Sequence, residues 1–337
     1  RISATRAGSS KSGARRNAKS KVDPSHFILT PAEMDELVKQ DGTMVHGSYS
    51  RVHEANWNGQ PVMVKILLRQ DLKREGLINF AVLGGECARA QGTRIAGAIG
   101  LCITRPFLGL IFPRYDSGSL QIMLDRAMLG RSRDQVAHRS KARDALGTPT
   151  LDNDSARVVV LGLIKAIAEL HEVGKRGHGS LRPANVMIVA RSTEVLDVHL
   201  IDFFLSKIKT NMGTMTMVPS VAYLAPENLR GEDGNMEADI FVFGTMLYEI
   251  AVRQPAFDGS NALEVGYHIL SGFRPDLNFV EDPRLRELIA DCWNDDAAAR
   301  PKARDVAKRL EASLRERGLY GGNAKKKGRK ARDRQDR

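Results

Sequence analysis

The alternation of apolar and polar positions in the first third of the chain predicts strands joined by tight turns. Residues 43–67 fit this strand pattern, and Asn58-Gly59 within them is a strong signal for a two-residue hairpin turn. Residues 71–91 predict a helix, and the short apolar runs 99–103 and 108–112 predict two more strands. This part of the chain should therefore form a sheet accompanied by one helix.

The pattern changes to helical spacing after Leu120. Residues 160–171 carry apolar side chains 3.6 residues apart on average, which predicts an amphipathic helix. The segment 126–155 before it is polar and rich in Arg, Ser and Asp, which favours a loop or a partly ordered insertion. Two apolar runs, 186–189 and 196–201, predict a second hairpin.

Three further helices are expected towards the end of the chain. Residues 239–251 are apolar nearly all round, which predicts a buried helix. Residues 285–293 predict an amphipathic helix, and residues 303–316 predict a final helix. The order of a strand-rich unit followed by a helix-rich unit predicts an α+β protein with a cleft between its two parts.

Composition narrows the class of protein further. The chain has 337 residues, of which 42% are hydrophobic, so it can bury a sizeable core and is not a disordered chain. Its three cysteines form no C-x-x-C pair, which argues against a structural zinc site and favours a reducing compartment. The sequence has no membrane-length apolar run and no visible signal peptide, so we expect an intracellular protein, cytoplasmic or nuclear.

The positive charge is concentrated at the two ends of the chain. The formal net charge is +11, with +7 in residues 1–21 and +6 in residues 318–337, so the middle is near neutral. The chain begins with Arg rather than Met, and we expect a fragment or a processed form. Both ends have few large apolar residues and are expected to be disordered. They are either contacts for an anionic partner, such as nucleic acid or membrane, or solvated ends with no single partner.

Several short motifs in the first two thirds of the chain resemble those of the protein kinase family. Val62-Met63-Val64-Lys65 resembles the V-A-I-K strand. Residues 178–185, with the letters HGSLRPAN, occupy the place of H-R-D-L-x-x-x-N. Residues 200–204, with the letters LIDFF, occupy the place of the D-F-G segment.

The remaining motifs follow in the family's order. Residues 225–227 are an intact A-P-E, and residues 239–244 resemble the buried helix that supports the catalytic loop. Cys292-Trp293, followed by Arg300-Pro301, resembles the end of the tyrosine-kinase-like branch. In that family an arginine pairs with the A-P-E glutamate, which here implies a pair between Arg300 and Glu227.

The resemblance covers residues 22–316 and implies a bilobal protein kinase-like fold. Its β-rich N-lobe would span 22–113 and its α-helical C-lobe 114–316, with 126–155 as a loop insertion. The basic tails would then be residues 1–21 and 317–337. The implied function is protein phosphorylation or signalling, with ATP and magnesium as cofactors and a protein as substrate or partner.

The resemblance also assigns roles to single residues. Lys65 would hold the phosphates of ATP, while Asn185 and Asp202 would bind magnesium. These oxygen ligands suit a hard cation. The plainer alternatives are a surface lysine ending a strand and two residues that cap local turns.

Other nucleotide contacts are implied more weakly. Gly47 and Val52 align with the glycine-rich loop, which keeps one glycine of three, and Arg114 and Tyr115 align with the hinge after Phe112. The helix glutamate that should pair with Lys65 is uncertain. A count without gaps places Leu83 there, whereas a rotation or a short gap would bring in Glu86.

The sequence departs from the family pattern at residues that take part in phosphate transfer or its regulation. The catalytic aspartate, which accepts the proton of the substrate hydroxyl, is replaced by Ser180. A general base contributes about 10²–10⁴-fold to a rate, and serine is no comparable base without an activator. Gly179 replaces the arginine that receives the activation-loop phosphate, so Thr210, Thr214 or Thr216 would lack that partner. Phe204 replaces the D-F-G glycine.

Three hypotheses about function follow from these residues. The first is a pseudokinase that binds ATP but works in signalling by binding or scaffolding. The second is an active atypical Ser/Thr or Tyr protein kinase with reduced turnover. The third is an adaptor for polyanions that binds through its basic tails.

Overall fold

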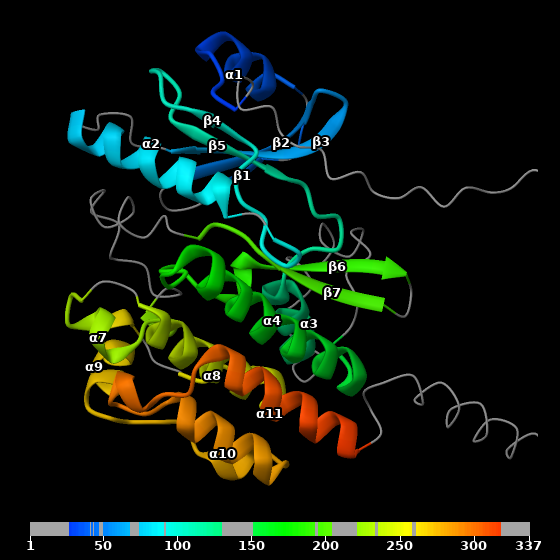
Figure 1. Ribbon diagram of the computed structural model, residues 1–337, viewed down its shortest axis with the longest axis vertical. Helices are drawn as coiled ribbons and strands as arrows, with labels where there is room; N and C mark the ends of the chain where they lie inside the picture. The colour runs from blue at the N-terminus through cyan, green and yellow to red at the C-terminus, as the bar shows by residue number, and fades with distance from the viewer. Residues whose placement is uncertain are drawn as a thin grey trace, which may run out of the picture.

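The protein, seen here as a computed structural model, has a strand-rich part above a helical part (Figure 1). The structure describes residues 27–40, 42, 44–46, 50–67, 74–90, 92–129, 151–192, 195–203, 221–232, 235–257 and 261–317. This confirms the α+β architecture of a β-sheet N-lobe and a helical C-lobe.

The sheet of the N-lobe has five antiparallel strands in the order β1-β2-β3-β5-β4. The strands are β1 (Met44–His46), β2 (Ser50–Trp57), β3 (Gln60–Leu67), β4 (Gly100–Cys102) and β5 (Gly109–Pro113). Asn58 and Gly59 join β2 to β3 with φ angles of 52° and 76°. Both angles are left-handed, as a type I′ hairpin requires, so the predicted turn is confirmed.

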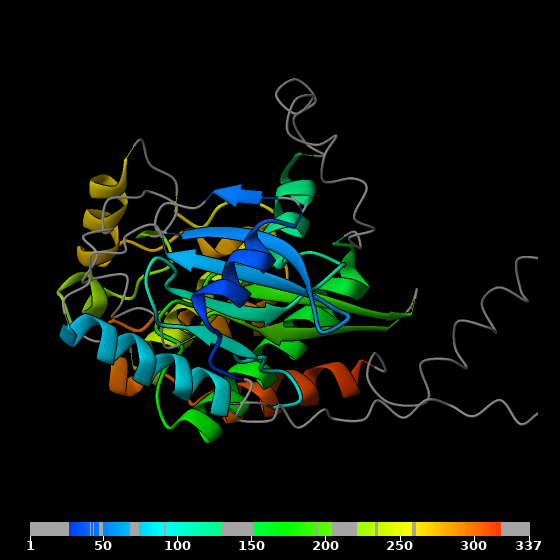
Figure 2. The same cartoon turned by 90° about the horizontal axis from the view of Figure 1, so that it is seen from above.

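The two faces of β3 serve different purposes. Val62, Val64 and Ile66 lie on one face in a small core, where helix α1 (Pro31–Val38) packs through Met34 and Leu37. Viewed from above, α1 lies over the strands (Figure 2). The intervening residues of β3, which include Lys65, lie on the opposite face because successive side chains alternate across a strand.

Helix α1 was not predicted, although its start carries a recognisable signal. Thr30 and Glu33 form a capping box, in which the Glu33 carboxylate accepts from the Thr30 N–H at 2.8 Å. The segment before the helix runs along β4, since the N–H of Leu29 donates to Leu101 and the N–H of Leu101 donates to Phe27, both at 2.8 Å. The N-terminal segment therefore extends the sheet and then covers it.

Helix α2 (Arg74–Arg89) fulfils the helix prediction for residues 71–91 and accompanies the sheet. At Gly84 the helix comes close to the sheet, where an added Cβ would lie 3.0 Å from a methyl of Leu101 and 3.4 Å from one of Leu110. The glycine that weakens the helix on propensity grounds thus lets it approach the sheet.

The C-lobe is built from helices and one short hairpin. Its helices are α3 (Leu120–Leu129), α4 (Asn153–Gly174), α7 (Pro226–Leu229), α8 (Met236–Val252), α9 (Ala262–Leu270), α10 (Pro283–Cys292) and α11 (Ala303–Glu316). Three-residue 3-10 turns occur at Pro183–Asn185, Leu277–Phe279 and Ala297–Ala299. The hairpin of β6 (Val186–Ser192) and β7 (Val195–Leu200) confirms the second predicted hairpin.

Two boundaries differ from the prediction for 126–155. Helix α3 continues to Leu129, four residues into the expected loop, because Leu120, Met123 and Leu124 bury one face of it. Helix α4 begins at Asn153, where the Asp152 side chain accepts from the N–H groups of Asp154 and Ser155. Residues 130–150 of this segment lie outside the described residues.

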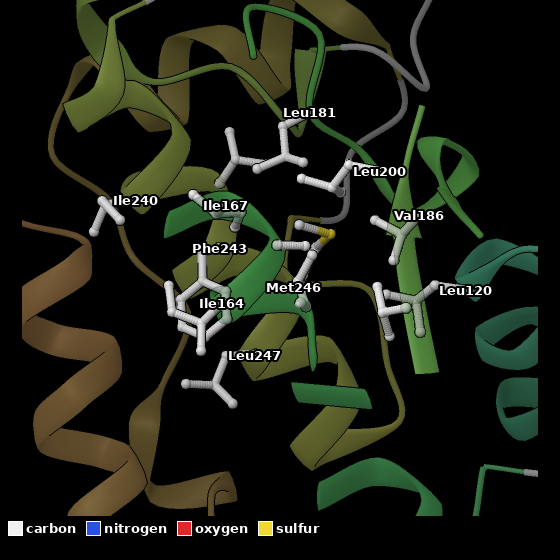
Figure 3. Close-up of a cluster of buried hydrophobic side chains, with 14 of the residues drawn as sticks. Leu120, Ile164, Ile167, Leu181, Val186, Leu200, Ile240, Phe243, Met246 and Leu247 are labelled. Carbon is white, nitrogen blue, oxygen red and sulfur yellow. The ribbon is translucent and has the colours of Figure 1, made fainter. Parts of the chain in front are cut away.

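The main core lies between α4 and α8 and beneath the β6–β7 hairpin. Figure 3 shows side chains of α4, α8 and the hairpin gathered there, with Ile164, Phe243 and Val186 among them. Nearly every side chain of α8 is buried, which confirms the prediction of a buried helix for 239–251. Among the helices that the structure describes, none is long and apolar enough to cross a membrane.

Candidate active site

The centre of the site is an ion pair between the two lobes. Lys65 Nζ lies 2.6 Å from Asp202 Oδ1, and the two side chains are 12% and 4% exposed. In the sheet, Lys65 lies directly opposite Val52 on β2. Asp202 follows β7 in a left-handed conformation with φ of 64°, which aspartate tolerates better than most residues. Two residues that are 137 positions apart in the chain, and that the resemblance assigned to phosphate and to magnesium, therefore meet.

Glu86 does not pair with Lys65, so that expectation is wrong. Its carboxylate instead accepts from Arg176 Nη1 at 2.7 Å. The reason is the rotation of α2, because Gly84 faces the sheet and Glu86 comes about 200° further around the helix. Arg176 lies beyond the end of α4, so this contact links α2 to the C-lobe.

The side of α2 that faces the ion pair carries Cys87. Its thiol is fully buried, and burial raises its pKa to about 12, with smaller influences from the charges of Asp202 and Lys65.

A carboxylate of α8 holds the start of the loop 178–185. Asp239 Oδ2 accepts from the backbone N–H of His178 at 2.7 Å and lies 2.8 Å from His171 Nε2 on α4. Gly177 approaches the start of α8 so closely that a Cβ there would collide with the carbonyl of Asn235. His171 and the backbone of His178 thus both hydrogen-bond to Asp239.

Asn185 closes the same loop from the other side. Its Nδ2 donates to the carbonyl of Ser180 at 2.7 Å, and its own carbonyl accepts from Ile201 N–H at 3.1 Å. The second bond brings Asn185 next to the segment that carries Asp202. Since the amide donates to Ser180 through its nitrogen, its oxygen is directed away from that bond, and together with the Asp202 carboxylate it fits a hard cation.

Ser180, which the motif assignment places where the family carries its catalytic aspartate, is held through its backbone. Its N–H donates to His178 Nδ1 at 3.2 Å, and its carbonyl is held by Asn185. The loop around it therefore keeps its supporting contacts although the acid is absent. Within the described residues, no group of three or more His, Cys, Asp or Glu side chains is arranged to hold a metal ion.

The hinge residues are engaged within the protein through their side chains. Arg114 Nε lies 3.0 Å from Asp116, and its Nη1 lies 3.5 Å from Glu54 on β2. The Tyr115 hydroxyl lies 3.0 Å from His199 Nδ1 on β7, and burial raises the pKa of Tyr115. Both side chains thus fix the connection between the lobes.

The A-P-E glutamate makes the contact that the resemblance implied. Arg300 binds Glu227 through two parallel hydrogen bonds of 2.7 and 2.9 Å. Arg300 is fully buried and Glu227 is 6% exposed at the side chain. Trp293 of the same end motif is also buried and donates from Nε1 to Thr245 at 3.1 Å.

Some predicted positions lie outside the described residues. These are Gly47 in the glycine-rich loop, Phe204 after Asp202, and the threonines 210, 214 and 216. Asp239 begins the segment 239–244 that the resemblance assigned to support of the catalytic loop, and its carboxylate makes that contact. Sequence reasoning missed Arg176, which nothing in the sequence singles out.

Comparison with known proteins agrees with this geometry. A family model described as protein tyrosine and serine/threonine kinase matches residues 38–310. The serine/threonine-protein kinase VIK of Arabidopsis thaliana is 29% identical over 293 residues, which are 84% of this chain and 61% of VIK. The serine/threonine-protein kinase CTR1 of the same plant is 27% identical over 261 residues, 76% of this chain and 29% of CTR1.

A third relative comes from Acanthamoeba polyphaga mimivirus and is named as a serine/threonine-protein kinase/receptor. It is 28% identical over 301 residues, which are 86% of this chain but 17% of the viral protein. The chain thus spans less than two thirds of the length of each of these three relatives.

Proposed function

Because the chain belongs to the protein tyrosine and serine/threonine kinase family, we propose that it is a pseudokinase that binds ATP with magnesium. It transfers phosphate poorly and acts in signalling by binding a protein partner. The observation that carries this proposal is a complete catalytic-loop scaffold in which Ser180 stands where the base should be. A damaged fold would have lost the scaffold as well.

Nucleotide binding is supported by the residues of the ion pair. Lys65 supplies a cation on the sheet face towards the C-lobe, where it would contact phosphate oxygens. Asp202 and Asn185 would hold magnesium, which supplies charge neutralisation to the phosphates when bound. Since the side chains of Arg114 and Tyr115 are engaged elsewhere, their contribution to adenine would come from the backbone.

Impaired transfer is supported by the absence of a base at position 180. The missing proton acceptor corresponds to a loss of about 3–5 kcal/mol of transition-state stabilisation. Glu86, bound to Arg176, does not help to orient Lys65. Binding groups are therefore retained while groups that act during transfer are lost.

An active serine/threonine kinase of low turnover is the second candidate. It is favoured by the names of the relatives, which are serine/threonine kinases. We also propose that the chain belongs to the tyrosine-kinase-like branch, because Cys292-Trp293 and Arg300 match the motif at the end of that branch. The basic tails could bind an anionic partner whether the protein is a pseudokinase or an active kinase.

The binding half of the proposal is tested by thermal unfolding with and without ATP and magnesium. Saturating MgATP should raise the melting temperature of the wild type by a few degrees. Lys65→Met should abolish that shift, while Lys308→Met, at an exposed lysine of α11, should retain it. A wild type that shows no shift at millimolar MgATP would remove nucleotide binding from the proposal.

The catalytic half is tested by restoring the carboxylate. Wild-type transfer from radiolabelled ATP to casein should be near background. Ser180→Asp should increase it at least tenfold, because a positioned base contributes about 10²–10⁴-fold. Ser180→Asn has a similar shape without the base and should stay at background. Robust Lys65-dependent transfer by the wild type would favour the active-kinase candidate instead.

A further inference from the structure

Arg182 lies in the loop 178–185 between Ser180 and Asn185, and its side chain takes no part in the contacts that support this loop. Within the described residues its guanidinium forms no hydrogen bond or ion pair, and its Nε is buried without a partner. A buried donor without an acceptor is unfavourable, so a native protein that keeps one usually fills it with a water, an ion or a ligand. Arg182 is therefore a candidate binding residue.

The backbone directs Arg182 to the same side of the loop as Ser180. Arg182 is extended, with φ of −169° and ψ of 161°, as is usual for a residue before proline. Leu181 and Pro183 are buried, whereas Ser180 and Arg182 are partly exposed. Figure 3 shows Leu181 among the side chains of the C-lobe core. Since residues two positions apart share one side of an extended segment, Ser180 and Arg182 lie on the side away from that core, with Cα atoms about 7 Å apart.

Hydrogen bonds fix the backbone on both sides of this arginine. The Arg182 carbonyl accepts from Asn185 N–H at 2.9 Å, and the Asn185 amide donates to the Ser180 carbonyl at 2.7 Å. Asp239 holds the start of the same loop. A cation on a fixed backbone loses less freedom when a ligand binds, which favours affinity.

The acids near Arg182 are engaged with other partners. Burial raises the pKa of Tyr223, the charges of Glu249 and Asp125 raise it further, and the charge of Arg182 opposes them, so these groups lie close to one another. Glu249 accepts from the Tyr223 hydroxyl at 3.0 Å, and Asp125 accepts from Gln121 Nε2 at 2.9 Å. Among the described residues neither acid forms an ion pair with Arg182, whose charge stays available to a ligand.

Position 180 decides which ligand the arginine can hold. An aspartate there would place a negative charge about 7 Å from the backbone of Arg182 and would repel an anion bound to it. Ser180 removes this charge and offers a hydroxyl, which can donate a hydrogen bond. A phosphate ester carries a charge of about −1.5 to −2 and three acceptor oxygens, and arginine binds such a group through two parallel bonds. The pair of Arg182 and Ser180 therefore fits a phosphate ester.

We propose that the partner of this protein is a protein that already carries a phosphorylated side chain, and that Arg182 and Ser180 bind its phosphate. This inference rests on the proposed function, because the exchange that removes the base also removes the repulsion of the phosphate. The ligand is the product of a protein kinase reaction carried out by another enzyme. The site thus recognises phosphorylation instead of producing it.

The test measures how well the immobilised full chain retains a peptide library at about 150 mM salt, where exposed charges are largely screened. The library has phosphoserine at its centre and randomised residues around it, and two matched libraries carry serine or glutamate at the centre. The phosphoserine library should be retained at least fivefold better than either, since phosphate has more charge and more acceptor oxygens. Equal retention of the serine library would refute the proposal, and equal retention of the glutamate library would refute a phosphate site.

Variants of the two residues locate the contact. Arg182→Met should reduce retention at least tenfold, whereas Arg284→Met, which removes an exposed arginine, should leave it unchanged. Both variants keep the basic ends of the chain, so attraction to those ends is the same in both. Ser180→Asp should reduce retention at least fivefold and Ser180→Asn should preserve it, which covers the case in which Arg182→Met fails to fold. Full retention by a folded Arg182→Met or by Ser180→Asp would overturn the proposal.

Lys65→Met separates this inference from nucleotide binding. It should lose the MgATP-induced shift in melting temperature and still retain the phosphoserine library. A wild type that retains the library without an MgATP shift would remove nucleotide binding alone, whereas an MgATP shift without retention would remove the phosphate site alone. Inorganic phosphate at about 1 mM should displace less than half of the bound peptide, because it lacks the contacts of the peptide chain. Complete displacement would assign the site to a free anion and contradict a protein partner.

Discussion

Two ion pairs of this protein differ in how far water reaches them. Arg300 and Glu227 are 0% and 6% exposed at the side chain and form two parallel hydrogen bonds. Arg176 and Glu86 are 37% and 32% exposed and share one bond of 2.7 Å. The first pair joins two segments of the C-lobe, while the second joins α2 of the N-lobe to the end of α4.

The difference in exposure indicates which of the two ion pairs contributes to the stability of the fold. An isolated charge inside the C-lobe is costly, so Arg300 and Glu227 must be kept together or replaced together. A half-exposed pair contributes about 0–1 kcal/mol, so the position of α2 is set by apolar contacts around Gly84 and Cys87 rather than by Glu86. Within the C-lobe, the A-P-E segment is thus held by a buried polar pair, whereas α2 is held by packing.

The largest effect on the free energy of unfolding is expected from replacing Arg300. Arg300→Met should lower the free energy of unfolding by about 3–5 kcal/mol, because Glu227 is left buried without its partner. The matched control is Arg284→Met, which removes an exposed pair with Glu316 at 2.6 Å and should change stability by less than about 1 kcal/mol. Urea unfolding measures both, and equal effects would refute the distinction between buried and exposed pairs.

A buried acid on α8 gives the next largest effect, and it depends on pH. Burial raises the pKa of Glu249 from 4.5 to about 7, against the opposing bonds from Ala256 N–H and the Tyr223 hydroxyl. The folded protein therefore holds a proton that the unfolded chain releases, and stability falls as pH rises from about 4.5 through 7.

Replacing this acid by its neutral analogue should remove that dependence. Relative to the wild type, Glu249→Gln should gain about 2–4 kcal/mol of unfolding free energy between pH 4 and pH 8. Urea unfolding of both proteins across this range isolates the effect, because other titrating groups are shared. A constant difference between the two proteins would show that Glu249 keeps its charge when buried.

Glu86 should matter much less. Glu86→Gln should lower the unfolding free energy by no more than about 1 kcal/mol and leave the MgATP-induced shift in melting temperature unchanged. Cys87→Asp, which places a charge on the packed face of the same helix, is expected to cost at least 3 kcal/mol. If Glu86→Gln abolished the MgATP shift, α2 would depend on the half-exposed pair after all.

The smallest effect on stability is expected from the two basic ends. Deleting residues 1–21 and 318–337 should change the free energy of unfolding by less than about 0.5 kcal/mol, because these segments have few large apolar residues. It should also remove salt-dependent binding to duplex DNA, measured by fluorescence anisotropy at several salt concentrations. Unchanged DNA binding would locate the polyanion contact in the folded domain. Binding of the same two proteins to phosphatidylserine vesicles tests whether the anionic partner is a membrane instead.

The sequence predicted local structure well where one residue type determines it. Asn58-Gly59 fixed a hairpin because few other residues accept left-handed angles, and the apolar helix at 239–251 could only be buried. The pair of Arg300 with Glu227, which the resemblance implied, also forms. These features depend on backbone preference or on strict motif spacing.

The sequence did not predict features that depend on how elements pack. The sequence left the partner of Lys65 open between Leu83 and Glu86. It could not decide, because the rotation of α2 depends on the contact of Gly84 with Leu101. Helix α1 is only eight residues long, which is too short for a clear helical repeat of apolar residues. Its capping box is the one strong signal in its sequence. A cavity in the C-lobe is lined by side chains of α4, α8, α10 and α11, a grouping that no linear pattern reveals.

The N-terminal segment has a practical consequence for anyone who expresses a fragment. The family match begins at residue 38, yet Leu29, Met34 and Leu37 lie in the core before that point. A fragment trimmed to the match would uncover both the outer sheet face and the edge of β4 that Phe27 and Leu29 now protect. Exposed strand edges pair with one another, so such a fragment should aggregate, whereas one that starts before Phe27 should stay monodisperse.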